Sequence, residues 1–299
     1  MRTDWEKIEQ LQDGVRFLAI VGIILSAGAL FFGFIGRANT QTPWILLGGL
    51  VIAGIFWWRF YRRLKAYKES YKGYVVHKAA EGMFDRYEYY PQHGFQSEEI
   101  RATGIMAMGN RYNSEDMIEG VYKGVDFRRA DMYIAQHVQS GKSSYTIEYL
   151  RGEWLTFTYN KNFVSDLQIR TKGFRYANTK TSRLFTSADV RRHEFETEST
   201  EFNKAFECTC QDDTEAFYLL TPRVMEMLLL LRDEFRCDFM VGFVHNRLHF
   251  AINSGKNNME PPVFRSTSFE YEMEMVRREL KIITNIVDSL AIDRKLFVE

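Results

Sequence analysis

The chain lacks the features by which most enzymes and metal-binding proteins are recognised. Its 299 residues include only three cysteines and five prolines, and no Pro/Gly/Ser-rich linker divides it. An odd, small number of cysteines provides no disulfide framework and is typical of a reducing compartment. The 39 basic and 39 acidic residues give a formal net charge of zero, which does not resemble a nucleic-acid-binding footprint. Phosphate-loop, dinucleotide-binding and nucleophile-elbow motifs are also missing from the sequence.

Charge is absent from two runs near the start of the chain. Phe17–Ile35 holds 19 residues without a charge, and Trp44–Trp58 is a second, shorter run. A helix rises about 1.5 Å per residue, so about 20 apolar residues cross the ~30 Å hydrocarbon core of a bilayer. We therefore predict a transmembrane helical hairpin over 17–58, with spans at about 17–36 and 43–60. The alternative is a buried hydrophobic hairpin of a soluble protein.

Basic residues predict how this hairpin is oriented. The loop between the runs has Arg37, whereas six basic residues follow the second run: Arg59, Arg62, Arg63, Lys65, Lys68 and Lys72. An excess of Lys and Arg marks the cytoplasmic side of a membrane. Both termini are therefore expected in the cytoplasm, with residues 1–16 as a cytosolic segment. Ala27-Gly28-Ala29 resembles a signal-peptidase site, but the mixed charges before it and the second run after it argue against cleavage.

Helical spacing continues past the second run and predicts a basic juxtamembrane helix over 59–84. Its candidate contacts with anionic lipid headgroups are Arg59, Arg62, Arg63 and Lys65. Each such contact is worth about 1 kcal/mol near the surface. The same four residues also belong to the basic excess that predicts the membrane orientation, and that role alone would explain their presence.

Small residues recur at steps of three and four along the first span, at Ala19, Gly22, Ser26, Ala29, Gly33 and Gly36. Such a stripe lets a second helix approach closely. We expect that helix to be the second span of the same chain, which offers Gly49 and Ala53. A homo-oligomer is the alternative. Neither apolar run carries a charge, so no ion pathway is predicted.

Residues 85–299 are predicted to form a cytosolic α+β domain, undivided or in two subdomains, built on antiparallel sheet with packed helices. Turn residues at Tyr122-Lys123-Gly124 and Arg151-Gly152 separate the strands of a predicted antiparallel meander. Its strands, and three further ones, are expected at Met117–Val121, Val125–Ala135, Tyr145–Tyr149, Trp154–Tyr159, Asp166–Arg170, Phe239–Val244 and Leu248–Ile252.

Two helices of this domain have readable starts. Thr221-Pro222 combines a cap with a proline in the first turn, and Thr267 with Glu270 matches a capping box. The second of these helices is predicted to run to about Leu290 with an apolar seam. Because the seam widens toward its end, we expect it to pack on the sheet, and a coiled-coil dimer is the alternative.

No catalytic, cofactor-binding or metal-ligating residues are predicted. His245 and His249 have zinc-helix spacing, but the pattern around them is strand and turn. Cys208 and Cys210 are expected as buried small hydrophobes on a strand. Their Cα atoms would lie about 6.5–7 Å apart, at or beyond the usual disulfide limit. The positions to inspect for acid–base chemistry or anion binding are Glu115, Asp116, Glu119, Asp126, Arg128, Arg129, Asp131, Arg191 and Arg192.

Four stretches resemble a bacterial family known as a domain of unknown function, number 3137: Gly104–Tyr133, Asn160–Phe174, Glu198–Leu231 and Val241–Ile252. The most specific part runs from Glu201-Phe202, through Phe206, to Leu220-Thr221-Pro222. The resemblance implies a bacterial two-span protein of the plasma membrane with a cytosolic domain after the hairpin. It brings no catalytic residues.

Together these features favour a membrane-anchored cytosolic module that binds or scaffolds a protein partner or a lipid headgroup. The expected partners are the bilayer and a further protein, not nucleic acid. The alternative is a membrane-associated enzyme acting on lipid or envelope precursors. Exposed aromatic surface would favour the first, and a pocket with convergent titratable groups would favour the second.

Overall fold

The computed structural model describes residues 2–35, 42–141, 143–158, 163, 166–176, 192–257 and 259–291. The chain forms two compact units. One contains Met1–Ala79 and Glu260–Arg277, and the other contains Ala80–Met259 and Arg278–Glu299. The segment Glu260–Arg277, far along the chain, thus belongs to the same unit as the first 79 residues.

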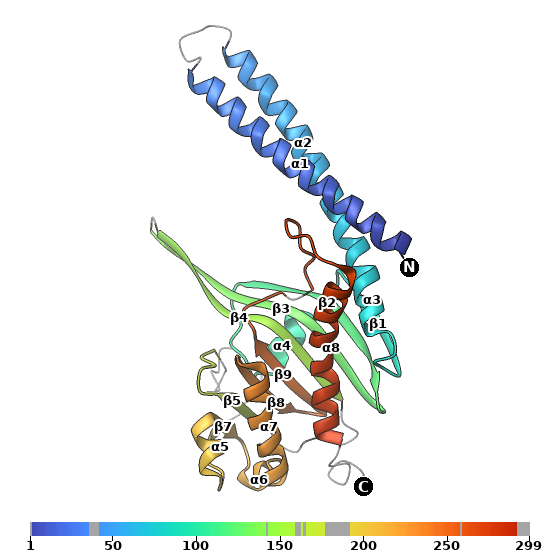
Figure 1. The fold of residues 1–299 in the computed structure, drawn as a ribbon. Helices are drawn as coiled ribbons and strands as arrows, with labels where there is room; N and C mark the ends of the chain where they lie inside the picture. Colours follow the sequence, from blue (N-terminus) through green and yellow to red (C-terminus); the bar gives the residue numbers. More distant parts are fainter. Residues whose placement is uncertain are drawn as a thin grey trace. The chain divides into compact units, whose positions relative to one another are not determined.

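The elements follow one another as shown in Figure 1. The helical part comprises α1 (Arg2–Ile35), α2 (Thr42–Tyr71), the π-helical turn η2 (Lys72–Val76) and α3 (His77–Ala80). The sheet and its helices comprise β1 (Arg86–Tyr90), α4 (Ser97–Ala102), β2 (Arg111–Tyr122), β3 (Val125–Ser140), β4 (Ser143–Thr158), β5 (Leu167–Thr171), β6 (His193–Phe195), α5 (Thr200–Ala205), β7 (Phe206–Cys210), α6 (Asp213–Leu219), α7 (Pro222–Phe235), β8 (Asp238–Val244), β9 (Arg247–Asn253) and α8 (Phe269–Ala291).

Small residues bring α1 and α2 together within the chain. A Cβ added at Gly49 would lie 3.1 Å from the Cβ of Ala29, and one at Gly22 would lie 3.5 Å from the ring of Trp57. The Trp57 indole N–H donates to Ser26 Oγ at 3.1 Å. This is the intrachain contact that the small-residue stripe predicted. The predicted hairpin tip around Arg37 lies outside the described residues.

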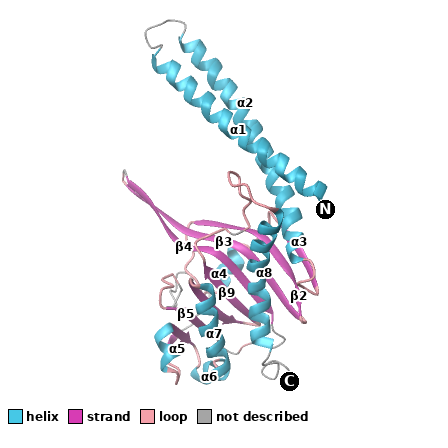
Figure 2. Cartoon of the chain, viewed as in Figure 1, coloured by secondary structure: helices cyan, strands magenta, loops and turns pink. Residues whose placement is uncertain are grey.

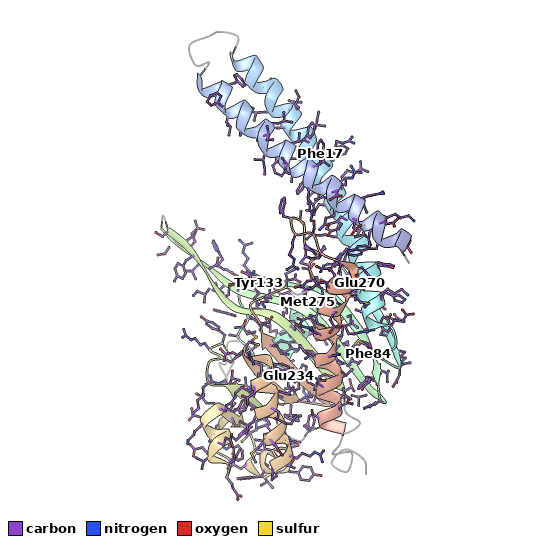
Figure 3. The ribbon with its side chains drawn as sticks, in the orientation of Figure 1. Phe17, Phe84, Tyr133, Glu234, Glu270 and Met275 are labelled. Atoms are coloured by element: carbon purple, nitrogen blue, oxygen red, sulfur yellow. The ribbon has the colours of Figure 1, made fainter. Side chains whose placement is uncertain are left out.

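Large apolar side chains are exposed on the middle part of α1 and on α2, and Phe17 is labelled among them in Figure 3. Phe17 is 64% exposed, Ile24 63% and Trp58 57%. Among the described residues, one helix is long and apolar enough to cross a membrane, over Asp4–Phe32 within α1. That finding is weak evidence for membrane association and leaves the second span as a prediction.

The returning segment Glu260–Arg277 is held against the hairpin by buried polar contacts. The Pro262 carbonyl accepts hydrogen bonds from Gln12 Nε2 at 2.6 Å and from the Tyr67 hydroxyl at 2.7 Å. The carboxylate of Glu260 pairs with the nearly buried Lys72 at 3.1 Å. Gln12, Tyr67 and Lys72 thus each have an acceptor, which makes the burial of these donors tolerable.

The second unit is built on one nine-stranded sheet in the order β1-β2-β3-β4-β9-β8-β5-β7-β6 (Figure 2). Every pairing between neighbouring strands is antiparallel. The predicted α+β class on an antiparallel sheet is therefore confirmed. The hairpin of β8 and β9 is also confirmed, and His245 takes a left-handed backbone conformation (φ 56°) in its turn.

One predicted turn is wrong. Arg151-Gly152 lies inside β4, which continues from the first of the two predicted strands into the second. A Cβ at Gly152 would stand 2.1 Å from the carbonyl oxygen of Ile252, so glycine is needed here for the close approach of β9 rather than for a chain reversal. The prediction took a glycine inside a strand for a turn residue.

Helix starts were predicted more accurately. Thr221 Oγ1 accepts the backbone N–H of Val224 at 3.3 Å, which confirms the cap of α7. At α8 the predicted cap is wrong by one residue, because Ser268 Oγ accepts the N–H of Tyr271 at 3.2 Å. The α8 seam is buried, as expected for sheet packing, at Leu280, Ile283, Ile286 and Val287. The side chain of Leu290 lies outside the described residues.

Strands β3 and β4 extend past their neighbours as a two-stranded arm. Pairing with β2 ends at Ala135, and pairing with β9 begins at Glu153. Between these limits Gln136–Ser140 and Ser143–Ile147 pair with each other. Asn110 closes the base of the arm, since its side-chain amide donates to and accepts from the backbone of His137 at 2.9 and 2.7 Å.

Candidate functional site

A row of polar residues crosses the sheet on the side of α4. In the strand register, Glu88 of β1 faces Glu119 of β2, which faces Arg128 of β3. Arg128 faces Thr156 of β4, and Thr156 faces His249 of β9. Residues opposite one another in register point to the same side of a sheet. Five neighbouring strands therefore contribute one polar side chain each to a single line.

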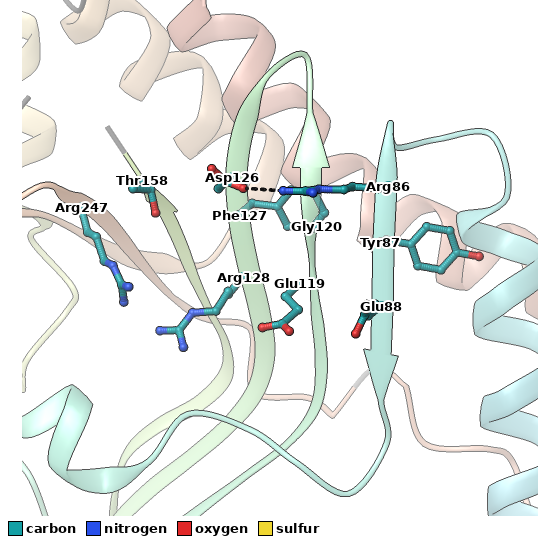
Figure 4. Close-up of a pocket in the computed structure, with 10 residues that line it drawn as sticks. All are labelled: Arg86, Tyr87, Glu88, Glu119, Gly120, Asp126, Phe127, Arg128, Thr158 and Arg247. Atoms are coloured by element: carbon teal, nitrogen blue, oxygen red, sulfur yellow. Dashed lines mark ion pairs between the residues drawn. The ribbon is translucent and has the colours of Figure 1, made fainter. Parts of the chain in front are cut away.

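An open pocket of about 380 Å³ lies over the outer half of this row (Figure 4). Its three arginines are all engaged by carboxylates. Arg86 pairs with Asp126 at 3.5 Å, while Arg128 and Arg247 both bind Glu99 of α4, the latter at 3.0 Å. The residues lining it are Arg86, Tyr87, Glu88, Glu119, Gly120, Asp126, Phe127, Arg128, Thr158 and Arg247.

The chemistry of this pocket suits salt-bridge recognition. Arginine stays protonated in proteins, so the three arginines of the pocket are fixed positive charges beside Glu88, Glu119 and Asp126. His249, farther along the row, accepts the Trp154 indole N–H on Nδ1 at 3.3 Å. Burial lowers the pKa of His249 to about 3, so the imidazole is neutral. The pocket is a mixed-charge surface able to exchange its own ion pairs for those of a ligand.

The opposite side of the same strands buries charge instead of exposing it. Arg129 is completely buried and pairs with Asp131 at 2.5 Å and with Glu153 at 3.2 Å. Glu279 of α8 faces this cluster, and burial followed by the neighbouring Glu153 raises the pKa of the Glu279 carboxyl to about 8. These groups link the helix to the sheet, and the Arg129 side chain is shielded from solvent.

The acid–base candidates from the sequence do not share one cleft. Glu115 faces Asp131 in register, and both line a small pocket of about 190 Å³. Asp116 is buried in a bulge with φ 59° and accepts the Tyr89 hydroxyl at 2.5 Å. Arg128 points to the other side of the sheet, into the α4-side pocket.

The paired arginines proposed for anion binding are divided in the same way. Arg129 pairs with Glu153 in the buried cluster. Arg192 pairs with Asp166 at 2.9 Å, and only 4% of the Arg192 side chain is exposed. Neither is available to a headgroup, so that interpretation is wrong for both. Arg191 lies outside the described residues, and Glu119 and Asp126 line the α4-side pocket.

The four candidate lipid-contact residues are all exposed on α2. The guanidinium of Arg62 lies over the ring of Trp58, 5.0 Å from its centroid. The guanidinium of Arg63 lies beside Gly14 of α1, where an added Cβ would come within 2.9 Å of it. Arg59 and Lys65 complete the group, which has the exposure that headgroup contact requires.

One cluster was missed in the sequence. His193 of β6 stands opposite Cys210 of β7 in register, and Asp213 follows at the start of α6. His193 Nε2 lies 2.6 Å from Asp213 Oδ1 and 3.8 Å from Cys210 Sγ. The only local signal is the Cys-x-x-Asp spacing, because His193 reaches the others through a strand of three residues.

The chain matches a family model described as "Protein of unknown function (DUF3137)" over residues 148–292. This confirms the predicted resemblance over that range, which holds three of the four quoted stretches but not Gly104–Tyr133. Among solved structures, the chain is similar to the crystal structure of the mycobacterial trehalose monomycolate transport factor A, TtfA. The identity is 11% and the TM-score 0.40, covering 72% of this chain and 95% of that one. No curated protein matches the chain.

Proposed function

We propose that the protein is a membrane-anchored binding or scaffolding module. In this proposal α1 and α2 both cross the bacterial plasma membrane, and both chain ends lie in the cytoplasm. The sheet unit then presents a charged binding surface in the cytosol, where a partner protein docks by exchanging ion pairs with the α4-side pocket.

The observation that carries the anchor is the exposure of apolar side chains on both helices. In a soluble hairpin these side chains would be the core, yet only 22% of the most apolar window of α1 is buried. Surface of this kind is transferred favourably out of water, at about 25 cal/mol per Å². The exposed apolar side chains are Phe17, Ile20, Ile23, Ile24, Leu30, Phe31, Phe32, Leu47, Leu50, Val51, Ile52, Ile55, Trp57 and Trp58.

The binding role is supported by the pocket chemistry. Arg86 and Asp126 are 77% and 64% exposed, so their pair is screened and contributes little to stability. A partner with complementary charges can replace it at small cost. The enzymatic alternative would instead draw on Glu115 and Asp131, which meet at the smaller pocket beside Lys256.

Orientation is tested with single-cysteine reporters in a chain whose three native cysteines are replaced by alanine. A membrane-impermeant maleimide should label Thr40→Cys, between the helices, in spheroplasts with an intact inner membrane. It should label Ser144→Cys, exposed on β4, only after lysis. Labelling of Ser144→Cys before lysis, with Thr40→Cys protected, would overturn the proposed topology.

The docking surface is tested by crosslinking in the native host followed by purification in mild detergent. Arg86→Glu reverses one charge of the pocket, and Arg175→Glu reverses an exposed arginine outside it. A stoichiometric partner should persist with Arg175→Glu and fall several-fold with Arg86→Glu. Equal recovery with both variants would remove the pocket from the proposal.

A further inference from the structure

We propose that His193, Cys210 and Asp213 form a binding site for a divalent transition metal, with Zn²⁺ the best match to the ligand set. The cluster lies on the side of the sheet opposite the α4-side pocket, so the proposal stands independently of the docking surface. Zn²⁺ takes thiolate, imidazole and carboxylate ligands together, a combination that magnesium and calcium do not favour.

Two of the ligands, His193 and Cys210, lie on neighbouring strands. The third, Asp213, is available because its neighbour Asp212 caps the helix. Cys210 ends β7 and is fully buried, with His193 directly across on β6. The N-terminus of α6 is capped by Asp212, whose carboxylate accepts the N–H groups of Thr214 and Glu215 at 2.7 and 3.3 Å. Asp213 is therefore not needed for the cap and turns its carboxylate toward Cys210.

The three ligand atoms converge on one point. Cys210 Sγ lies 3.4 Å from Asp213 Oδ1, and both atoms approach the same imidazole nitrogen, His193 Nε2. In a nucleophile–histidine–carboxylate triad the nucleophile and the carboxylate bind opposite ring nitrogens. Convergence on a single nitrogen suits a shared metal ion and does not suit a catalytic relay.

The separations fit tetrahedral zinc after a small movement. With metal–ligand bonds of about 2.0–2.3 Å, tetrahedral ligand atoms stand about 3.4–3.6 Å apart. The two distances from Sγ, 3.4 and 3.8 Å, already match, and only the 2.6 Å gap between Nε2 and Oδ1 must open. His193 and Asp213 are 52% and 60% exposed, so both can move. Three protein ligands leave a fourth position for water or a partner's side chain.

Metal binding has a proton signature here. Cys210 binds a metal as the thiolate, and in the metal-free chain its S–H donates to Asp213 Oδ1 at 3.4 Å. Forming the metal–sulfur bond breaks the S–H bond and releases that proton to solvent. Metal binding should therefore be accompanied by proton release.

The experiment titrates Co²⁺, a spectroscopic substitute for Zn²⁺, into the full chain purified metal-free in mild detergent. We expect a thiolate-to-cobalt charge-transfer band that saturates at one ion per chain and disappears when Zn²⁺ is added. The double variant Cys208→Ala/Cys237→Ala leaves Cys210 as the only thiol and should keep the band. Cys210→Ala should lose it, and His193→Gln, an exposed change, should weaken binding at least tenfold.

Two results would overturn the proposal. One is a wild-type chain with no thiolate–cobalt band between about pH 6 and 9. The other is a band that survives Cys210→Ala or vanishes in Cys208→Ala/Cys237→Ala while both proteins keep the wild-type melting temperature. His193→Gln keeps the test decisive if Cys210→Ala fails to fold, because unchanged cobalt affinity in that variant would also refute the site.

Discussion

The two units of this molecule depart from the usual burial pattern in opposite ways, one by exposing large apolar side chains and the other by burying charged ones. The helical hairpin leaves Phe17 and Ile24 exposed, while the sheet unit encloses Arg129 with two carboxylates. In water, exposing large apolar side chains is unfavourable. Burying the charge of Arg129 is tolerable only because it is paired with carboxylates. The contrast teaches that burial must be judged against the surroundings, which for the hairpin we propose to be lipid.

The largest effect is expected from Arg129→Met, which removes the cation that Asp131 and Glu153 share. Breaking a buried charge pair on one side costs about 3–5 kcal/mol of unfolding free energy. Denaturant unfolding in detergent, followed by tryptophan fluorescence, measures the loss. The matched change Arg86→Met removes an exposed pair and should cost under about 1 kcal/mol. Equal costs would erase the distinction between the two pairs.

Ile24→Asp tests the other side of the comparison by placing a charge where the hairpin exposes an apolar side chain. A carboxylate near the centre of a membrane helix opposes insertion by about 2.5–3.5 kcal/mol. The fraction of protein resisting carbonate extraction should fall sharply. Glu6→Lys, an exposed change outside the apolar run, serves as the control. An unchanged fraction for Ile24→Asp would argue for a hairpin that lies outside the bilayer.

Glu279→Gln should make stability less sensitive to pH. Because the pKa of Glu279 is raised from 4.5 to about 8, the folded state holds an extra proton between those values. Its stabilising contribution is complete below about pH 4.5 and is lost as the pH rises toward 8. Glutamine mimics the protonated form, so the variant should be more stable than wild type by about 1–2 kcal/mol at pH 8.5 and similar to it at pH 5. Melting curves across this range provide the measurement, and parallel curves for both proteins would contradict it.

The smallest effect is expected from Arg59→Gln combined with Arg62→Gln. Each loses about 1 kcal/mol of attraction to anionic headgroups. Native mass spectrometry of protein extracted in mild detergent should show several-fold less retained anionic lipid. Lys7→Gln neutralises an exposed charge before the first apolar run and should leave lipid retention unchanged. Equal retention in all three proteins would remove these arginines from the headgroup contacts.

Helix caps and hairpin turns could be predicted from the sequence, whereas pairings between strands that are distant in sequence could not. The Thr221 cap and the hairpin around His245 depend on neighbours within a few residues, and both were predicted. The meander was recognised, but Gly152 was read as a turn because its reason, the approach of β9, lies 100 residues away. The same limit hid His193, which meets Cys210 only through a strand of three residues.

For Arg128 and Arg129, the sequence already contained the information that they lie on opposite sides of the sheet, but the prediction did not use it. Adjacent strand residues point to opposite sides of a sheet, so two neighbouring arginines on β3 could not serve one surface. One lines the open pocket and the other anchors the buried cluster. Alternation within the predicted strand was enough to separate them, whereas the identity of the buried partners required the register with β4.

The arm formed by the ends of β3 and β4 has a practical consequence. A two-stranded ribbon without further partners is marginally stable, and its amides should exchange with deuterium long before those of the central strands. Its tip, at Gly141 with φ 57°, is the place where a protease should cut first and where an insertion should be tolerated best. An epitope or rigid fiducial grafted there would give single-particle imaging a landmark on a 35.2 kDa protein while leaving both polar faces of the sheet untouched.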